Sequence, residues 1–568
     1  MTEPILSARN VHVYFQLPGG GRLHAVRGID LDLFRGETVA IVGESGAGKS
    51  AFAKAILHLH QLPFTPNRTK IEGSVSLNAP FSADLVRASD DVIRDARARA
   101  VGMIFQDALS ALNPVHRIGD QIEEALRQVK PGIDREAAAN QVYNIVRAIG
   151  LPDPERAIRA FPHQLSGGQC QRVMIAIAAV RFPVALIADE PTTALDVTVQ
   201  AQILKLLKSI QDIRGMGMLF ISHDLGVVAE IADRVAVMYA GEIVEIGTSA
   251  KVFSAPEHAY TRALLASRPG MGSRRRPTVP AAIGSTKETS GAVKSAPVLT
   301  TDKVSFGYRS RLFGRGSHRF VLQDLSLDIE PGEVHGLVGE SGSGKSTFGR
   351  LALGFLKPDS GSIKTCGTTP YAVRGVHRRD LRRNVQVVYQ DSATALNPRM
   401  SLGHSAAEGL VINGMALEDA REEVHRLFDR VRLPTALMNR YPHEVSGGQR
   451  QRVCIARAIA TKPRLLIADE PVTALDVSVQ AQILDLFGEL QAELGLAMLL
   501  ISHDLGVVRE LSCKVSVMHN GRIVETGSTA DVFGHPRTAY SQKLISSIPG
   551  QNSTLDKVAV RTTMAGKG

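Results

Sequence analysis

Residues 165–196 read LSGGQCQRVMIAIAAVRFPVALIADEPTTALD, and residues 445–476 repeat the pattern as VSGGQRQRVCIARAIATKPRLLIADEPVTALD. Each copy contains a glycine-rich turn that opens a helix, then an apolar strand that ends in Asp-Glu, then a short acidic loop. This order of elements is suited to holding the phosphate chain of a nucleotide and placing a water molecule beside it. If this interpretation is correct, the rest of the chain should contain the other phosphate-binding segments of a nucleotide site, once in each half.

The duplication extends well beyond these stretches. His223 and His503 lie 280 positions apart, and the halves align at this spacing without a gap over residues 161–270. The spacing between Lys49 and Lys345 is 296, so insertions lie upstream of the aligned segment. We expect the segments that carry chemistry to be fixed and the connecting surface to vary.

Alternating strand and helix patterns in each half predict an α/β fold with a parallel sheet covered on both faces. Near the end of each half, residues 235–247 and 515–527 predict antiparallel hairpins, and Asn520-Gly521 is typical of a type I′ turn. We predict a first domain over residues 1–269, a flexible Gly/Pro/Ser-rich linker over 270–297, a second domain over 298–550 and a disordered tail over 551–568.

Composition narrows the possible functions. The 568 residues carry a net charge of +10, which is compatible with nucleic acid, an acidic membrane face, phosphate ligands or scattered surface arginines. The four cysteines form no CxxC pair, so neither a zinc site nor an iron–sulfur cluster is expected. We expect no signal peptide and no bilayer-spanning helix, and therefore a protein that serves any membrane from the cytoplasm through partners.

Two segments, GESGAGKS at 43–50 and GESGSGKS at 339–346, satisfy the P-loop pattern between an apolar strand and a helix. Their backbone N–H groups would bind phosphate oxygens, the lysines would neutralise the β- and γ-phosphates, and the serines would bind Mg²⁺. The predicted nucleotide-binding residues are Gly43, Glu44, Ser45, Gly46, Ala47, Gly48, Lys49, Ser50 and Ala51, with Gly339, Glu340, Ser341, Gly342, Ser343, Gly344, Lys345, Ser346 and Thr347.

The apolar strands that follow end in Asp189-Glu190 and Asp469-Glu470. We predict that each Asp binds Mg²⁺, directly or through water. Each Glu, one residue beyond the strand, is the candidate general base that polarises the attacking water.

Two further pairs of polar residues follow apolar strands. His223 and His503 close the strands in FISHD and LISHD, where a histidine would contact the γ-phosphate and orient the water. Gln106 and Gln390 are candidates for meeting both Mg²⁺ and the water, although spacing alone does not decide between this role and an ordinary surface position.

The glycine-rich turns form a second kind of anion site, because a serine hydroxyl and exposed N–H groups meet at a helix start. The residues are Ser166, Gly167, Gly168 and Gln169 in one half, and Ser446, Gly447, Gly448 and Gln449 in the other. Each half thus has two phosphate-binding surfaces far apart in sequence, and one nucleotide need not use both from the same half.

This set of motifs, in this order, resembles the ATP-binding-cassette (ABC) ATPases over nearly the whole chain, twice. The resemblance implies two tandem P-loop NTPase cassettes, each with a RecA-like parallel-sheet core, an antiparallel β subdomain and a helical signature subdomain. It implies that the cassettes pair head to tail within the chain, so that Lys49 shares an ATP site with Ser446–Gln449, and Lys345 with Ser166–Gln169. Asp196 and Asp476 match the family's interface loop. The adenine-stacking aromatics fall on Phe15 and Tyr308, with Tyr14 and Phe306 as competitors.

The segments FQDALSALNP, DVTVQAQIL and HAYTRALLASRPG resemble the peptide and nickel importer branch, here with two ATPase subunits fused. This implies ATP and Mg²⁺ as ligands, no iron–sulfur cluster, two integral-membrane permease subunits and an extracytoplasmic substrate-binding protein. It places the chain peripherally on the cytoplasmic face of the inner membrane, with no nucleic acid partner. The halves differ modestly: Cys170, Ile177 and Leu165 stand where the second half has Arg450, Arg457 and Val445.

Two alternatives stay open from the sequence. Soluble tandem cassettes occur in ribosome-associated translation factors, which suits the basic charge but not the short, Gly/Pro-broken linker. Fused sugar-importer ATPases usually have degenerate motifs in one half, whereas both halves are intact here. Substrate identity (dipeptide, oligopeptide, glutathione, nickel chelate or opine) is not encoded in this chain.

Overall fold

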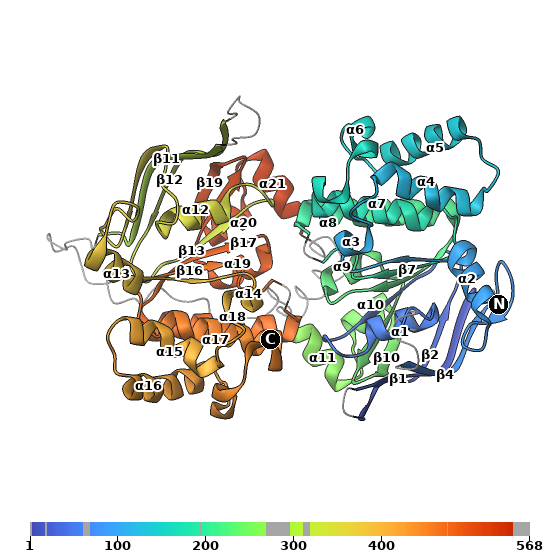
Figure 1. The fold of residues 1–568 in the computed structure, drawn as a ribbon, viewed down its shortest axis with the longest axis horizontal. Helices are drawn as coiled ribbons and strands as arrows, with labels where there is room; N and C mark the ends of the chain where they lie inside the picture. Colours follow the sequence, from blue (N-terminus) through green and yellow to red (C-terminus); the bar gives the residue numbers. More distant parts are fainter. Residues whose placement is uncertain are drawn as a thin grey trace, which may run out of the picture. The chain divides into compact units, whose positions relative to one another are not determined.

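The computed structural model describes residues 3–17, 20–60, 69–193, 195–267, 296–309, 318–473 and 475–548. The predicted linker, except for residues 296 and 297, and the whole predicted tail lie outside this part of the chain. The described residues form two compact units, one from each half (Figure 1). No helix in the described ranges combines the length and apolar character needed to cross a bilayer.

The first unit alternates strands and helices as predicted. Its elements are β1 (Leu6–Gln16), β2 (Arg22–Leu33), β3 (Thr38–Val42), α1 (Lys49–Ile56), β4 (Thr69–Leu77), β5 (Ala83–Asp84), α2 (Asp90–Asp95), the π-helical turn η1 (Ala96–Ala100), β6 (Val101–Ile104), α3 (Ala108–Ala111), α4 (Ile118–Val129), α5 (Arg135–Ala148), α6 (Pro154–Arg159), the 3₁₀ turn η2 (Pro162–Gln164), α7 (Gly167–Ala179), β7 (Ala185–Asp189), α8 (Val197–Arg214), β8 (Gly217–Ile221), α9 (Leu225–Ile231), β9 (Arg234–Tyr239), β10 (Glu242–Thr248), α10 (Ser249–Ser254) and α11 (Ala259–Ala266).

The main sheet of this unit has the order β10-β9-β3-β8-β7-β6. Strand β3 pairs in parallel with both β8 and β9, and β7 pairs in parallel with β6 and β8, whereas the hairpin partner β10 is antiparallel. A second, antiparallel sheet has the order β2-β1-β4-β5. Helices α4, α5 and α6 gather beside α7 (Figure 1). The parallel sheet, the hairpin and the separate β and helical subdomains are therefore confirmed.

The second unit repeats this plan. Its elements are β11 (Leu299–Arg309), β12 (His318–Ile329), β13 (Val334–Val338), α12 (Lys345–Ala352), β14 (Ser360–Thr365), α13 (Gly375–Asn384), β15 (Val385–Val388), α14 (Ser392–Ala395), α15 (Leu402–Ile412), α16 (Leu417–Arg430), the 3₁₀ turns η4 (Thr435–Asn439) and η5 (Pro442–Glu444), α17 (Gly447–Ile459), β16 (Leu465–Asp469), α18 (Val477–Leu494), β17 (Ala497–Ser502), α19 (Leu505–Leu511), β18 (Lys514–His519), β19 (Arg522–Ser528), α20 (Thr529–Gly534) and α21 (Ala539–Ser546).

Its main sheet has the order β15-β16-β17-β13-β18-β19, and its antiparallel sheet the order β12-β11-β14. The β18–β19 hairpin turns at Asn520 and Gly521, whose φ angles of 49° and 77° are both positive. A type I′ turn requires positive φ at both central residues, so the turn predicted from Asn-Gly is confirmed.

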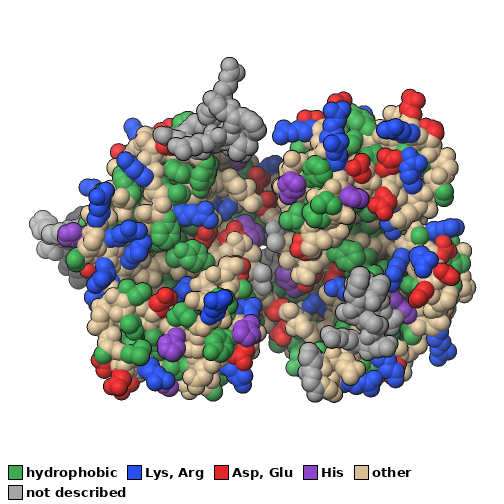
Figure 2. Space-filling model, viewed as in Figure 1, with side chains coloured by type: hydrophobic (Ala, Val, Ile, Leu, Met, Phe, Trp, Pro, Cys, Tyr) green, Lys and Arg blue, Asp and Glu red, His purple; other side chains and the backbone are tan. Residues whose placement is uncertain are grey.

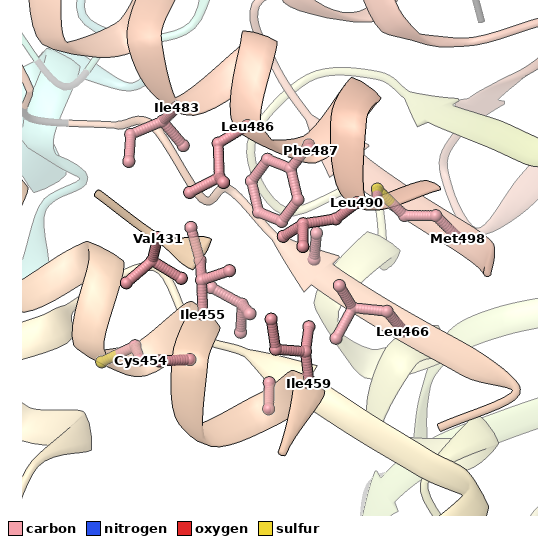
Figure 3. Close-up of a cluster of buried hydrophobic side chains, with 14 of the residues drawn as sticks. Val431, Cys454, Ile455, Ile459, Leu466, Ile483, Leu486, Phe487, Leu490 and Met498 are labelled. Carbon is pink, nitrogen blue, oxygen red and sulfur yellow. The ribbon is translucent and has the colours of Figure 1, made fainter. Parts of the chain in front are cut away.

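A large part of the core of the second unit lies between the main sheet and helices α17 and α18 (Figure 3). Ile455 and Ile459 of α17 face Phe487 and Leu490 of α18, and Leu466 of strand β16 lies beside them. Truncating one such fully buried phenylalanine to alanine typically costs about 3–5 kcal/mol of folding free energy. This packing fixes the glycine-rich turn that starts α17 relative to the strand that ends in Asp469.

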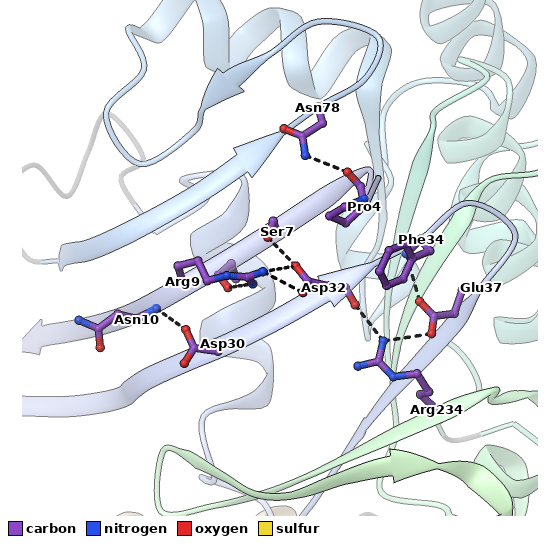
Figure 4. A network of polar contacts seen from close by, with 11 residues as sticks. Pro4, Ser7, Arg9, Asn10, Asp30, Asp32, Phe34, Glu37, Asn78 and Arg234 are labelled. Atoms are coloured by element: carbon purple, nitrogen blue, oxygen red, sulfur yellow. Dashed lines mark hydrogen bonds and ion pairs between the residues drawn. The ribbon is translucent and has the colours of Figure 1, made fainter. Parts of the chain in front are cut away.

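In the first unit, a polar network joins the antiparallel sheet to the start of β3 (Figure 4). Arg234 of β9 donates to a Glu37 carboxylate oxygen at 3.1 Å and to the Asp32 carbonyl at 3.3 Å. The Thr38 N–H donates to Asp233 Oδ2 at 2.8 Å. The strand that carries the P-loop is thus anchored at the end opposite to the loop.

Candidate active sites

Each P-loop connects a buried strand to a helix that begins at the lysine. Gly43 has a φ of 151°, and a Cβ atom there would lie 2.1 Å from the Met238 carbonyl oxygen, so the position accepts only glycine. The equivalent distance at Gly339, to the carbonyl oxygen of Met518, is 2.2 Å. These close approaches fix the path of the loop.

The P-loop lysines curl back over their own loops. Lys49 Nζ donates to the carbonyl oxygens of Gly43 and Glu44, both at 2.8 Å, and only 5% of the residue is exposed. Lys345 repeats these contacts in the second unit at 2.7 and 2.8 Å. The ammonium group is therefore held inside the loop that would surround the phosphates.

A serine and an aspartate meet at the end of strand β7. Ser50 Oγ donates to Asp189 Oδ1 at 2.7 Å, and Ser346 Oγ donates to Asp469 Oδ1 at 3.0 Å. Burial raises the pKa of Asp189 and of Asp469, although the serine hydrogen bonds oppose the shift. These hydroxyl and carboxylate oxygens are ligands that Mg²⁺ prefers. The described residues contain no cluster of three or more His, Cys, Asp or Glu side chains that would hold a metal. One hydroxyl and one carboxylate in each site fit an ion that takes water and substrate phosphates as its remaining ligands.

The glutamate after each strand contacts the histidine at the end of the neighbouring strand. Glu190 Oε1 lies 3.2 Å from His223 Nδ1, and Glu470 Oε1 lies 3.1 Å from His503 Nδ1. Both glutamates have positive φ angles, of 49° and 50°. The structure thus brings together the two side chains that the sequence predicts to act on the attacking water.

In each Glu–His pair, the contact favours the charged form of both side chains, although both are largely buried. Burial alone would lower the pKa of His223, but its hydrogen bond to Glu190 and the carboxylate charge outweigh this effect and raise the pKa. Burial alone would raise the pKa of Glu190, but the His223 contact and a hydrogen bond from Thr193 lower it. The second unit shows the same directions for the pKa values of Glu470 and His503.

These shifts predict a pH window for stability. The raised histidine pKa gives stabilisation that is complete below about pH 6.5 and is lost as the pH rises through the folded-state value. The lowered glutamate pKa gives stabilisation that is lost as the pH falls below about 4.5. We expect the melting temperature of the wild type to exceed that of His223→Gln/His503→Gln most between about pH 4.5 and 6.5. A gap in melting temperature that widens above pH 7 would contradict the assigned ion pairs.

The two candidate glutamines differ. Gln106 Nε2 donates to Glu190 Oε2 at 2.8 Å, which joins it to the Glu190–His223 pair. For Gln390 the described part of the chain provides no hydrogen-bond partner, and the residue is exposed. Both follow apolar strands, as predicted, and these are edge strands of the main sheets, but among the described residues only Gln106 donates to the candidate general base.

The glycine-rich turns are built as capped helix starts. Ser166 Oγ accepts from the Gln169 N–H at 3.4 Å, and Gln169 Oε1 accepts from the Ser166 N–H at 2.9 Å. Ser446 and Gln449 repeat this capping box, at 3.3 and 3.0 Å. Ser166, Gly167 and Ser446 are exposed or partly exposed, so the helix starts are accessible to an anion.

Helix α8 explains the second glycine of each turn. Asp196 caps α8 by accepting from the Val199 N–H at 2.9 Å. A Cβ atom at Gly168 would lie 2.6 Å from Val199 Cγ1, and one at Gly448 would lie 2.5 Å from Val479 Cγ1. Asp476 occupies the same place at the start of α18. The aspartate loop and the glycine turn are thus packed against each other in each unit.

The substitutions between the two signature helices change their polar contacts. Arg457 Nη1 donates to the Ala395 carbonyl of α14 at 2.8 Å, and Arg450 Nη1 donates to the Val445 carbonyl at 2.7 Å. In the first unit Ile177 packs among apolar side chains, and Cys170 Sγ contacts the Pro162 carbonyl at 3.4 Å. The halves are therefore unequal next to the predicted catalytic residues as well as in the contacts of Gln106 and Gln390.

Phe15 and Tyr308 occupy equivalent places on β1 and β11. Each lies five residues after a residue with positive φ (Asn10 at 47° and Lys303 at 46°), beyond the same strand irregularities. The ring of Phe15 lies edge-on to His60 at 4.9 Å. The competitors are placed differently.

Tyr14 stacks on His24 at 4.2 Å, on the other face of the strand from Phe15. Phe306 is 8% exposed and packs in the core, whereas Tyr308 is 45% exposed. The equivalence of Phe15 and Tyr308 therefore supports them over both competitors.

Sequence reasoning missed two pairs of residues. The hydroxyls of Tyr260 on α11 and Tyr540 on α21 accept from the P-loop N–H groups of Glu44 and Glu340, at 3.1 and 3.2 Å. Thr193 Oγ1 donates to Glu190 Oε2 at 2.9 Å, and Thr473 repeats this contact with Glu470 at 3.2 Å. The recurrence of these residues at the 280-residue spacing was the available signal.

The sequence model described as "ABC transporter" matches residues 26–193 and 322–473, which cover more than half of the chain. The chain belongs to the ABC transporter family. A second model, described as "Oligopeptide/dipeptide transporter, C-terminal region", matches residues 244–294 and 524–565. The matched C-terminal regions contain Tyr260 and Tyr540, so the residues that contact the P-loops lie in the branch-specific part of the ABC chain.

Curated relatives cover the whole fused arrangement. "Glutathione import ATP-binding protein GsiA" of Pectobacterium atrosepticum is 42% identical over 96% of this chain and 89% of the relative. The proteins of the same name from Salmonella typhimurium and Escherichia coli are 43% and 42% identical over 96% of this chain, and 90% and 89% of their own lengths. The predicted identity as an ABC ATPase with two fused cassettes is confirmed, and neither the translation-factor nor the sugar-importer alternative is supported.

Proposed function

We propose that the chain hydrolyses ATP at two composite sites to drive the import of small peptides, with glutathione as the first candidate, through separate membrane subunits. The observation that carries this proposal is the intact catalytic set in both units. Each has its own P-loop lysine, its own Ser–Asp pair and its own Glu–His pair. The choice of glutathione follows the names of the curated relatives, which are glutathione import ATP-binding proteins.

In the proposed reaction, Glu190 accepts a proton as a water molecule attacks the γ-phosphate, and His223 holds the carboxylate in place and contacts the phosphate. Lys49 and the N–H groups of the first P-loop neutralise the phosphate chain, and Phe15 stacks on adenine. Ser446, Gly447, Gly448 and Gln449 close this site from the other half. Lys345, Glu470, His503 and Tyr308 form the second site with Ser166, Gly167, Gly168 and Gln169.

Magnesium fits the Ser–Asp pairs. Ser50 with Asp189, and Ser346 with Asp469, would hold the ion, with Gln106 and Gln390 as further candidates. When bound, it would neutralise charge on the β- and γ-phosphates. The raised pKa of each buried Asp is a reason for the carboxylate to take up a cation. We propose no iron–sulfur cluster.

The proposed partners are two integral-membrane permease subunits and an extracytoplasmic substrate-binding protein, and no nucleic acid. The chain would act at the cytoplasmic face of the membrane, and the stretches after Gln106 and Gln390 would contact the permeases. To shift the ratio of closed to open cassettes from 1:99 to 99:1, ATP must bind the closed state more favourably than the open state by about 5.5 kcal/mol. Two phosphate clamps provide a physical source for that difference.

Uptake by cells tests the proposal. We expect a strain that lacks this chain to lose accumulation of radiolabelled glutathione at least about tenfold. Wild-type chain should restore it, and a Lys49→Ala/Lys345→Ala variant should not, because both phosphate-neutralising charges are gone. Unchanged uptake of glutathione and of a dipeptide panel in the deletion strain would overturn the proposed transport role.

A further inference from the structure

Helix α13 presents an exposed cluster of arginines on the second unit. Its sequence is GVHRRDLRRN, preceded by Arg374. Positions 378, 379, 382 and 383 are spaced so that they share one face of a helix, and all four are exposed. Lys and Arg side chains gather over the place where Figure 1 labels α13 (Figure 2). Leu381 is buried and anchors the helix to the core.

We call Arg374, Arg378, Arg379, Arg382 and Arg383 the α13 arginines. Within the described ranges, none of them forms an ion pair with a carboxylate. Like charges at neighbouring helix positions repel each other. The α13 arginines therefore concentrate five positive charges around a single carboxylate of the same helix, Asp380, with which none of them forms an ion pair in the described residues.

The equivalent segment of the first unit is neutralised. It comprises α2 and η1 and leads into β6 as α13 leads into β15, at the 284-residue spacing that relates Gln106 to Gln390. Arg94 pairs with Asp91 at 3.3 Å, and Arg99 pairs with Asp95 at 2.9 Å. Arg97 donates to the Leu57 carbonyl at 2.8 Å.

The difference in charge between the two segments arises from substitutions at individual equivalent positions. Asp90 and Asp95 are replaced at the equivalent positions by Arg374 and Arg379. Positions 90–99 hold three arginines and three aspartates, whereas positions 374–383 hold five arginines and one aspartate, Asp380, so the equivalent segment is neutral in the first unit and positive in the second. The fold itself does not require the positive charge, because the first unit fills this place with a neutral helical segment, α2 and η1, before the equivalent strand β6.

Apolar side chains accompany the α13 arginines. Val376, in the first turn of α13, is 72% exposed. Phe355, earlier in the chain, is 53% exposed. The residue before it, Gly354, packs closely on the backbone that leads to α13, because a Cβ atom there would lie 2.6 Å from the Pro370 carbonyl oxygen. Basic side chains beside an exposed apolar side chain on one helix are a feature of surfaces that bind at a membrane interface, and on α13 this side chain is Val376.

We propose that the α13 arginines, with Val376, bind the headgroups of anionic lipids. Guanidinium groups bind phosphate in a bidentate geometry, and basic side chains gain affinity from the negative potential of a membrane surface. A nucleic acid partner is less well matched, because binding single strands uses stacking aromatics along a groove and α13 contains no Phe, Tyr or Trp. This inference rests on the proposed function in one respect: the proposed function places the chain next to a membrane.

Cosedimentation of the full chain with lipid vesicles tests the proposal. Vesicles of phosphatidylcholine alone are compared with vesicles that contain 30 mol% phosphatidylglycerol (about a third anionic lipid). We expect wild type to bind the anionic vesicles at least about tenfold more strongly, and salt to weaken this binding. The variant Arg378→Gln/Arg379→Gln/Arg382→Gln should lose about a hundredfold, at roughly fivefold for each arginine.

The first unit offers a matched control. Arg94→Gln/Arg99→Gln removes exposed arginines from the equivalent segment, and we expect vesicle binding within about twofold of wild type. A second variant, Arg374→Asp/Arg379→Asp, copies the charges of Asp90 and Asp95 and should also abolish binding. Thermal unfolding and basal ATP hydrolysis, measured without lipid on each variant, show that the variants are folded and that the ATPase is unaffected.

Equal binding by wild type and both α13 variants would overturn the proposal. So would wild-type binding to single- or double-stranded DNA that exceeds binding to anionic vesicles at the same salt concentration. A chain that binds vesicles as expected but does not hydrolyse ATP would contradict the proposed function and leave the lipid site standing.

Discussion

Replacing both Glu190 and Glu470 by glutamine is expected to slow ATP hydrolysis by about a hundred- to ten-thousandfold while ATP binding persists. The amide keeps the shape of the side chain but is too weak a base to accept a proton from water. It also removes the negative charge that faces His223 and His503 at 3.2 and 3.1 Å. The measurement is single-turnover phosphate release together with equilibrium binding of ATP.

Thr193→Val/Thr473→Val is the control for this experiment. It removes only the hydroxyl groups that donate to the two glutamates. We expect a loss below about tenfold, since each carboxylate keeps its histidine partner. Normal hydrolysis by the Glu→Gln double variant would show that another group is the base, and the assignment would fail.

Ser166→Arg is expected to remove ATP from the site of Lys345 and to leave the site of Lys49 occupied. A bulky cation at the start of α7 would block the anion-binding turn, and that turn is proposed to serve the other half. Photo-crosslinking with an azido-ATP, followed by cleavage at a protease site inserted in the linker, identifies the labelled half. Labelling of the second half should fall at least about tenfold (a loss of about 1.4 kcal/mol).

Ser446→Arg is the mirror control and should remove label from the first half. A Ser166→Arg chain that loses label from its own half would show that each cassette closes its own site. The head-to-tail arrangement would then be wrong, while the P-loop and Glu–His assignments would stand.

Much of each candidate site could be predicted because the residues end neighbouring parallel strands. Asp189 ends β7, His223 follows β8, and the P-loop follows β3, and these three strands are adjacent in the sheet. The carboxyl ends of parallel strands meet at one edge, so motif order and strand pattern suffice to bring the side chains together.

Contacts that depend on loop conformation were not predictable in the same way. Gln106 and Gln390 follow equivalent strands with similar sequences, yet only Gln106 reaches the glutamate. Tyr260 reaches the P-loop from a helix more than 200 residues later, a pairing set by how α11 packs and not by any local pattern. The excess of arginines in α13 was visible in the sequence, but the absence of ion-pair partners within the described residues required coordinates.

The positive φ angles of Glu190 and Glu470 bear on how far the thermal stability of this protein can be raised. A non-glycine residue in the left-handed region carries a penalty of about 1–2 kcal/mol. Glycine or asparagine would relieve this penalty, but either would also remove the carboxylates that pair with His223 and His503. Backbone strain and a stabilising ion pair are therefore tied to the same two positions, and a more heat-resistant version of this ATPase has to gain its stability elsewhere.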